Sequence, residues 1–173
     1  MRPSIKSTLS ILLLLFPVWA YSEQTYQYLP EVNQYISDSI GKDCTTVQRT
    51  DYDSWVFQFT DPHPQVLGDF DGNGLEDVAL IVKCPGKGVS VTAFHRFEQG
   101  FKHFVLEARE ETFSIKEVLA KEGPGHVIIS MGDQPKETTN IEHPAIAVEW
   151  METCYEAIYI WVNGKYKRYY RGL

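Results

Sequence analysis

The sequence predicts an α+β protein: a mainly antiparallel β-sheet with one short helix near the N-terminus, folded as a single domain. Two observations lead to this fold class. Apolar residues recur at every second position in many short stretches after residue 44, and a period of two is typical of half-buried strands. Short turn sequences join these stretches, and hairpins between successive strands favour antiparallel pairing.

The helix is expected at residues 30–40. Proline is favoured at the first position of a helix, and the glycine at position 41 suits its end. Val32, Ile36 and Ile40 recur every four residues, so they form one apolar stripe. We expect this stripe to cover one face or edge of the sheet.

The predicted strands differ in how many of their faces are apolar. Residues 77–83 are apolar on both faces, which is typical of a central strand. Residues 55–59 alternate and place Trp55, Phe57 and Phe59 on one face. Residues 113–120 fit either a strand or a helical turn. Further strands are expected at residues 45–48, 65–67, 89–97, 101–106, 126–131 and 144–150, and the strand at residues 126–131 is expected to be buried.

The strongest hairpin signal is Asn163-Gly164, which separates two alternating stretches at residues 155–162 and 165–170. Residues 107–111 are highly charged and are expected to form a break. Residues 132–143 are polar and show no period, so we expect a mobile loop there.

Residues 1–22 have the features of a secretory signal peptide. Arg2 and Lys6 precede a short apolar core, and small residues follow it. The alternative is a membrane anchor, but the core is shorter than the roughly 20 residues that a spanning helix needs. Residues 23–173 are then one exported β-rich domain, without a membrane span, in the periplasm or outside the cell.

The chain is acidic, with a formal net charge of −7 that becomes −9 when Arg2 and Lys6 leave with the signal peptide. An acidic surface repels nucleic acid and anionic membranes. We therefore expect no nucleic-acid partner.

The exported domain contains three cysteines, Cys44, Cys84 and Cys154. Disulfides form readily in oxidising compartments, and three cysteines allow one bridge and leave one thiol over. The sequence leaves all three pairings open, and we favour Cys44–Cys84.

The most informative stretch is an acidic loop that runs straight into the apolar strand at residues 77–83. Calcium takes about six to eight oxygen ligands, and alternate residues of a tightly curled loop can direct oxygens at one centre. Gly72 and Gly74 permit the positive φ values that such a curl needs. Oxygen donors stand at alternate positions of the loop: Asp69, Asp71, Asn73, Leu75 (through its backbone carbonyl) and Asp77.

Two other interpretations of the loop were weighed. An EF-hand is not expected, because its twelfth position requires a bidentate Glu and this chain has Leu80 there. A polar turn held by Asx-type hydrogen bonds, without metal, stays open as the alternative to a calcium site.

The pattern Asp-x-Asp-Gly-Asn-Gly-x-x-Asp, followed by an apolar strand, resembles the calcium loop of FG-GAP and VCBS-type repeats of integrin-like β-propellers. The resemblance implies Ca²⁺ ligands at Asp69, Asp71, Asn73 and Asp77, with the Leu75 carbonyl. Asn73 stands where the family more often has Asp, which removes one charge. The motif occurs once, whereas a propeller needs several blades of about forty residues, so a full propeller is not expected. The chain looks more similar to small exported bacterial proteins that carry a single loop of this kind and have no assigned activity.

Two further sets of residues were considered as sites. His95 and His103 lie on paired strands and could face each other, but a zinc site needs three or four ligands and no third is evident, so both are interpreted as ordinary strand residues. The C-terminal hairpin is aromatic and basic, and its side chains could bind a protein or a glycan instead of only packing. This possible binding surface consists of Tyr166, Arg168, Tyr169 and Tyr170.

The sequence contains no Gly-x-Ser-x-Gly, P-loop or His-Glu-x-x-His motif, so it specifies no reaction. It favours a non-enzymatic binding or structural module with one Ca²⁺-stabilised loop. Two alternatives stay open: a periplasmic hydrolase or glycan-processing enzyme, and a secreted inhibitor or effector that acts through the C-terminal hairpin.

Overall fold

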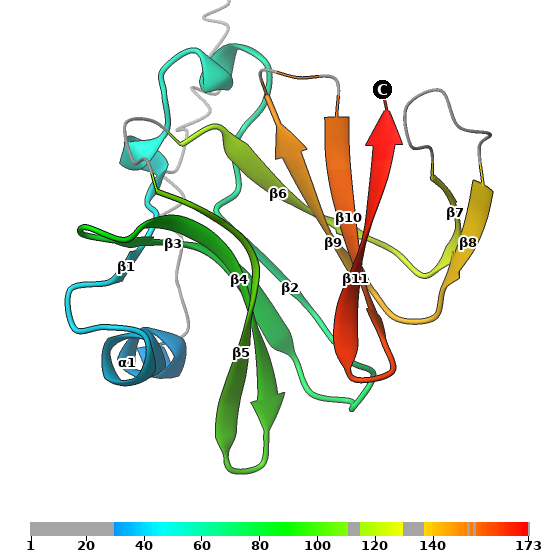
Figure 1. Cartoon of the computed structure of the whole chain (residues 1–173), viewed down its shortest axis with the longest axis horizontal. Coiled ribbons are helices and arrows are strands. Elements are labelled where there is room, and N and C mark those ends of the chain that lie inside the picture. Colours follow the sequence, from blue (N-terminus) through cyan, green and yellow to red (C-terminus); the bar gives the residue numbers. More distant parts are fainter. Residues whose placement is uncertain (1–29, 111–114, 130–136, 152, 154, 173) are drawn as a thin grey trace, which may run out of the picture.

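The protein is built in layers, as the computed structural model in Figure 1 shows. The structure describes residues 30–110, 115–129, 137–151, 153 and 155–172. One short α-helix covers a five-stranded sheet, a four-stranded sheet packs on the other face of that sheet, and a two-stranded ribbon follows. All pairings between the named strands are antiparallel and the sheets are open, so the predicted fold class is confirmed and the described residues form no propeller.

The first sheet has the strand order β1-β3-β4-β5, and β2 also pairs with β3. Its central strand is β3, which has neighbours on both sides and is buried along nearly its whole length, as its two apolar faces predict. The strands of this sheet are β1 (Thr45–Thr46), β2 (Gln65–Gly68), β3 (Asp77–Cys84), β4 (Gly88–Phe97) and β5 (Gly100–Arg109).

The second sheet has the strand order β11-β10-β9-β6, and β7 and β8 pair separately. At the β10–β11 turn Asn163 has φ 52° and Gly164 has φ 80°, which is the left-handed backbone that the Asn-Gly pair predicts. The strands are β6 (Glu117–Glu122), β7 (Gly125–Ile129), β8 (Glu137–Ile141), β9 (Ala145–Trp150), β10 (Tyr155–Val162) and β11 (Lys165–Gly172).

Three apolar cores separate the layers. The main core lies between the two large sheets, where Ala79 and Ile81 of β3 meet Ile146 and Val148 of β9. A second core lies between the helix and the first sheet, and a third lies between the second sheet and the β7–β8 ribbon. The loop that joins β2 to β3 therefore sits at the border of the two large sheets.

The helix α1 (Pro30–Ser39) occupies the predicted position. Val32 and Ile36 are buried on the first sheet, and Ile40 packs against the same core. The disulfide Cys44–Cys84 joins the segment after α1 to the end of β3, as favoured from the sequence. The signal-peptide prediction and Cys154 lie outside the described residues.

The prediction of a strand at residues 55–59 is wrong. The segment forms a short 3₁₀-helix, Val56–Gln58, in which Val56 is buried and Phe59 is 68% exposed. The carbonyls of Asp53, Trp55 and Val56 accept local hydrogen bonds here, so the backbone groups are satisfied without a neighbouring strand.

Three further predictions need correction. Part of the stretch expected as a mobile loop forms β8, which pairs along β7. β7, expected to be buried, is buried on one face only, because the side chains of His126 and Ile128 on its other face are exposed. The charged residues 107–109, expected as a break, continue β5, because Glu107 and Arg109 pair with Val91 and Val89.

None of the helices among the described residues is long and apolar enough to cross a membrane.

Candidate metal centre

The acidic loop occupies residues 69–76, between the end of β2 and the start of β3. Gly72 and Gly74 have φ values of 76° and 84°, so the two glycines supply the left-handed conformations that the sequence predicts. A Cβ at Gly72 would lie 2.4 Å from the His143 ring, whereas a Cβ at Gly74 would meet no atom within 4 Å. The loop is therefore packed closely on the segment before β9.

Asp77 closes the loop. Its side chain is fully buried, and its two oxygens accept hydrogen bonds from the backbone amides of Phe70 (2.9 Å) and Arg96 (2.7 Å). Burial raises the pKa of Asp77 to about 6; the Arg96 amide opposes this rise and the nearby Asp71 carboxylate adds to it. Asp77 therefore ties both ends of the loop to the end of β4.

Asx-type hydrogen bonds shape the rest of the loop. Asp71 Oδ1 accepts from the Asn73 amide (3.1 Å), and Asp69 Oδ2 accepts from the Gly74 amide (2.9 Å). Asn73 Oδ1 accepts from the Leu75 amide (2.7 Å), while its side-chain nitrogen donates to the Arg96 carbonyl (2.8 Å). These bonds are compatible with a polar turn and with a metal loop, so they do not separate the two interpretations.

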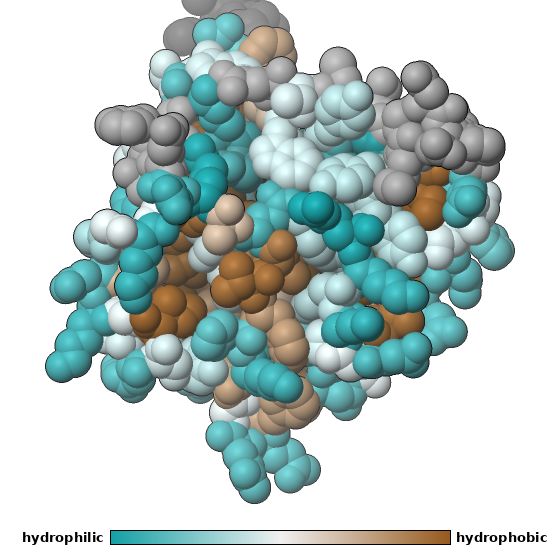
Figure 2. Space-filling view, in the orientation of Figure 1, coloured by the Kyte–Doolittle hydropathy of each residue, from teal (hydrophilic) through white to brown (hydrophobic). Residues whose placement is uncertain are grey.

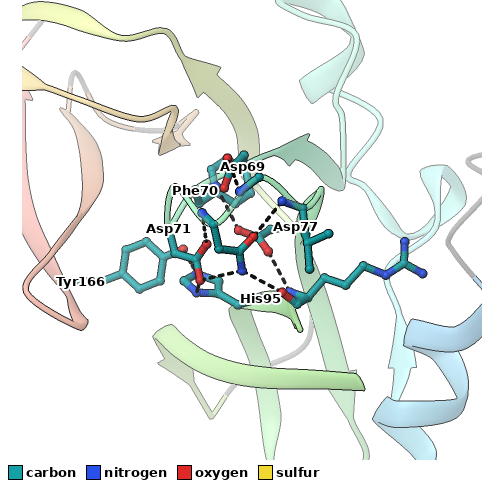
Figure 3. A network of polar contacts seen from close by, with 10 residues as sticks. Asp69, Phe70, Asp71, Asp77, His95 and Tyr166 are labelled. Carbon is teal, nitrogen blue, oxygen red and sulfur yellow. Dashed lines mark hydrogen bonds and ion pairs between the residues drawn. The ribbon is translucent and has the colours of Figure 1, made fainter. Parts of the chain in front are cut away.

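The structure brings Asp71 and Asp77 together with His95, a residue from β4 that is outside the loop. One ligand atom from each of the three lies within 4.8 Å of the others (Figure 3). Among the described residues, neither carboxylate has a Lys or Arg partner. Asp69 Oδ1, in the same loop, is buried and has no hydrogen-bond partner.

His95 is fully buried and both of its ring nitrogens face polar atoms. Nδ1 lies 3.1 Å from Asp71 Oδ2, without the alignment of a hydrogen bond, and Nε2 lies 2.6 Å from the Tyr166 hydroxyl. Burial lowers the pKa of His95 below its ordinary value, although the Asp71 carboxylate opposes this shift. The imidazole is therefore mainly neutral at pH 7, and its contact with Asp71 is not a full ion pair.

Three aromatic rings pack around His95. Its ring centroid lies 4.5 Å from that of Trp161, 4.8 Å from that of Phe104 and 5.4 Å from that of Tyr166. Trp161 and Tyr166 belong to the β10–β11 hairpin, so the loop is connected to the second sheet through His95. This packing fixes the orientation of the imidazole.

Sequence reasoning missed the role of His95, although a signal exists. Val89, Val91 and Ala93 form the buried face of β4, and His95 continues that face at the next alternate position. A histidine there has to be buried. His95 and His103 do not face each other, because Lys102 stands opposite His95 and His103 contacts the Tyr35 hydroxyl of α1.

The possible binding surface on the C-terminal hairpin is divided between two faces. Tyr166 and Arg168 line a cleft of about 300 Å³ between β5 and the hairpin. Tyr170 packs against the main core on the same face, while Tyr169 packs on the opposite face, against the β7–β8 ribbon. The other residues lining the cleft are Phe104, Val105, Leu106, Tyr159 and Lys165.

Comparison with known proteins finds no matching family model, no matching curated protein and no matching solved structure. The function of this chain therefore has to be inferred from its own residues.

Proposed function

We propose that this protein is an exported, non-enzymatic binding or structural module whose loop at residues 69–77 is stabilised by one Ca²⁺. The observation that carries the proposal is the pair Asp71 and Asp77. Their oxygens lie within 4.8 Å of each other, Asp77 is fully buried and the Asp71 side chain is 7% exposed. Two carboxylates held this close repel each other, and either a bound proton, as the raised pKa of Asp77 indicates, or a cation between them relieves the repulsion.

The loop residues fit a calcium ion in their chemistry. Carboxylate and carbonyl oxygens are the ligands that Ca²⁺ prefers. The buried Asp69 Oδ1 lacks a protein partner, and leaving a buried acceptor unsatisfied is unfavourable unless an ion or water reaches it. Asp69, Asp71 and Asp77 would supply carboxylate oxygens, Asn73 its amide oxygen and Leu75 its backbone carbonyl.

A cation in this loop would have a structural effect on the whole domain. The loop contacts β4 through the Arg96 carbonyl, lies against His143 in the segment before β9, and is linked to Tyr166 of the second sheet through His95. An ion that neutralises the carboxylates would therefore stabilise the border between the two large sheets. The proposed location is the periplasm or the outside of the cell, and the Cys44–Cys84 disulfide and the signal-peptide pattern support export.

Thermal unfolding with EDTA, and then with about 1 mM Ca²⁺, tests the proposal. Ca²⁺ at 100 times its Kd adds about 2.7 kcal/mol to the free energy of unfolding, which raises the Tm by about 5 to 10 °C for a domain of this size. The shift should disappear in Asp71→Asn, which keeps the size of the side chain but removes its charge.

The control is Glu76→Gln, an exposed carboxylate of the same loop outside the ligand set, which should keep the full shift. A wild-type Tm that does not respond to Ca²⁺ would mean that the loop is a metal-free polar turn.

The cleft beside the C-terminal hairpin supports a second candidate function, the binding of an anionic protein segment or glycan. Lys165 and Arg168 line this cleft together with the aromatic rings of Phe104, Tyr159 and Tyr166, on a chain that is otherwise acidic. Figure 2 shows apolar side chains near the middle of the face in view, in the region where Figure 1 draws β4 and β5. Val105 of β5, which also lines the cleft, is 56% exposed.

Fluorescence anisotropy with a labelled poly-glutamate peptide and, separately, a labelled heparin oligosaccharide tests this candidate. The double variant Lys165→Glu/Arg168→Glu should weaken binding of one of the two probes at least about tenfold, because a repulsive charge replaces an attractive one. The control Lys42→Glu/Lys87→Glu makes the same change in net charge at exposed sites elsewhere. Equal loss in both double variants would show that only net charge matters.

A further inference from the structure

His95 adds to the loop a donor that an all-oxygen calcium site does not have. It comes from β4, it is fully buried, and its Nδ1 lies within 4.8 Å of one oxygen each from Asp71 and Asp77. Figure 3 shows the three side chains directed toward one another, with Tyr166 on the far side of the imidazole. The group therefore combines two carboxylates with one nitrogen.

The two nitrogens of His95 have different surroundings. A neutral imidazole carries a proton on one nitrogen and a lone pair on the other. The Tyr166 hydroxyl, 2.6 Å from Nε2, can accept the hydrogen bond of an Nε2–H group. That tautomer leaves the lone pair on Nδ1, which is buried and has no hydrogen-bond partner among the residues that the structure describes. A buried acceptor beside two carboxylate oxygens is a position that a metal ion can satisfy.

We propose that Asp71, Asp77 and His95 form a mixed nitrogen–oxygen site that binds a divalent transition metal, Zn²⁺ in the first place. The inference goes beyond the proposed function: it shares the requirement for a cation at this loop, but it names a different class of ion and does not depend on Ca²⁺ binding. Imidazole nitrogen is a ligand of Zn²⁺ and other transition metals, whereas Ca²⁺ takes oxygen. A histidine that binds a metal through one ring nitrogen usually donates a hydrogen bond from the other nitrogen to a fixed partner, and the Tyr166 hydroxyl is in position to be that partner for Nε2.

The surroundings of His95 favour this assignment. The rings of Trp161, Phe104 and Tyr166 pack around the imidazole. An imidazole fixed in this way does not have to lose rotational freedom when a metal binds to it. The two ligand sets share Asp71 and Asp77 and differ in the rest: His95 would complete the Zn²⁺ set, whereas Asp69, Asn73 and Leu75 would complete the Ca²⁺ set.

The test is isothermal titration of the tag-free, EDTA-treated protein with ZnCl₂ and, separately, with CaCl₂. The wild type should bind one Zn²⁺ at least about tenfold more tightly than Ca²⁺. His95→Gln should weaken Zn²⁺ binding by about 100-fold or more and change Ca²⁺ binding less than about threefold, because a ligand is lost for one ion only. The control His103→Gln removes the histidine on the neighbouring strand and should leave Zn²⁺ binding unchanged.

Tyr166→Phe provides a second variant that keeps the histidine, should His95→Gln fail to fold. It removes the acceptor for Nε2, so Zn²⁺ binding should weaken by about 10- to 100-fold, and the visible absorption bands of bound Co²⁺ should shift relative to the wild type.

The outcomes separate this inference from the proposed function. If the protein binds Ca²⁺, and if its affinity for Zn²⁺ is unchanged in His95→Gln and Tyr166→Phe, the inference is overturned and the calcium proposal stands. Zn²⁺ binding that requires His95, with no Ca²⁺ binding, supports the inference and overturns the calcium proposal. Binding of neither ion overturns both.

Discussion

At the level of single residues, Gly72 and Gly74 form a matched pair for testing how the acidic loop packs. Both have positive φ, so an alanine at either position costs about 1–2 kcal/mol of backbone strain. Only Gly72 is also in close contact, because its Cβ would lie 2.4 Å from the His143 ring. We expect Gly72→Ala to lower the free energy of unfolding by about 1–3 kcal/mol more than Gly74→Ala does.

Urea unfolding of the two alanine variants measures this difference. When His143→Ala is introduced into both variants, Gly72→Ala and Gly74→Ala should lower the free energy of unfolding by the same amount, because the side chain that Gly72→Ala would meet is then gone. If the two single variants are equally unstable, or the difference persists without His143, the loop does not pack on this histidine.

The candidate site shows which residues the sequence can identify. The loop donors and the two positive-φ glycines follow from local spacing, because neighbouring residues of a tight loop are close in any fold. His95 and His143 reach the loop from β4 and from the segment before β9. Their positions depend on how the strands pack, so local spacing contains no information about them.

At the level of elements, prediction succeeded where a local signal agrees with the tertiary structure. The helix α1 has its proline, its glycine and its apolar stripe, and the β10–β11 hairpin has Asn163-Gly164 between two strands that pair along their full lengths. In both cases the residues that set the backbone lie within the element itself.

The elements that prediction missed depend on their neighbours. Alternation at residues 55–59 indicates a strand, but the backbone there is satisfied by local hydrogen bonds instead of by a neighbouring strand. β8 is the reverse case, a strand without a strand signal in its sequence. It lacks an apolar period and only Ile141 is buried, but each of its residues pairs with a residue of β7. Strand formation depends on the partner as much as on the sequence of the strand.

At the level of the whole molecule, the two large sheets are joined by polar contacts as well as by the main core. The Tyr159 hydroxyl of β10 donates a hydrogen bond to the Glu107 carboxylate of β5. Burial raises the pKa of Glu107, while the Tyr159 hydroxyl and the nearby Arg168 guanidinium oppose this rise. One titratable side chain therefore lies between the sheets, away from the acidic loop.

This arrangement gives a pH dependence with a definite sign. The pKa of Glu107 is higher in the folded protein than its ordinary value of 4.5 in the unfolded chain, so the folded state binds the proton more tightly. Its contribution to stability is complete below pH 4.5 and is lost as the pH rises through the raised pKa. Glu107→Gln keeps the acceptor for Tyr159 but cannot titrate, so the variant should become more stable relative to the wild type as the pH rises.

Urea unfolding of both proteins between about pH 4 and pH 8, in EDTA to remove any bound cation, measures this difference. Glu98→Gln, at an exposed carboxylate of the β4–β5 turn, corrects for the loss of one negative charge from an acidic chain. A difference in the free energy of unfolding between wild type and Glu107→Gln that widens with pH, beyond that of the control, shows that Glu107 is partly desolvated between the sheets. A difference of constant size would mean that Glu107 is solvated and does not join the sheets, since a solvated carboxylate has the same pKa in both states.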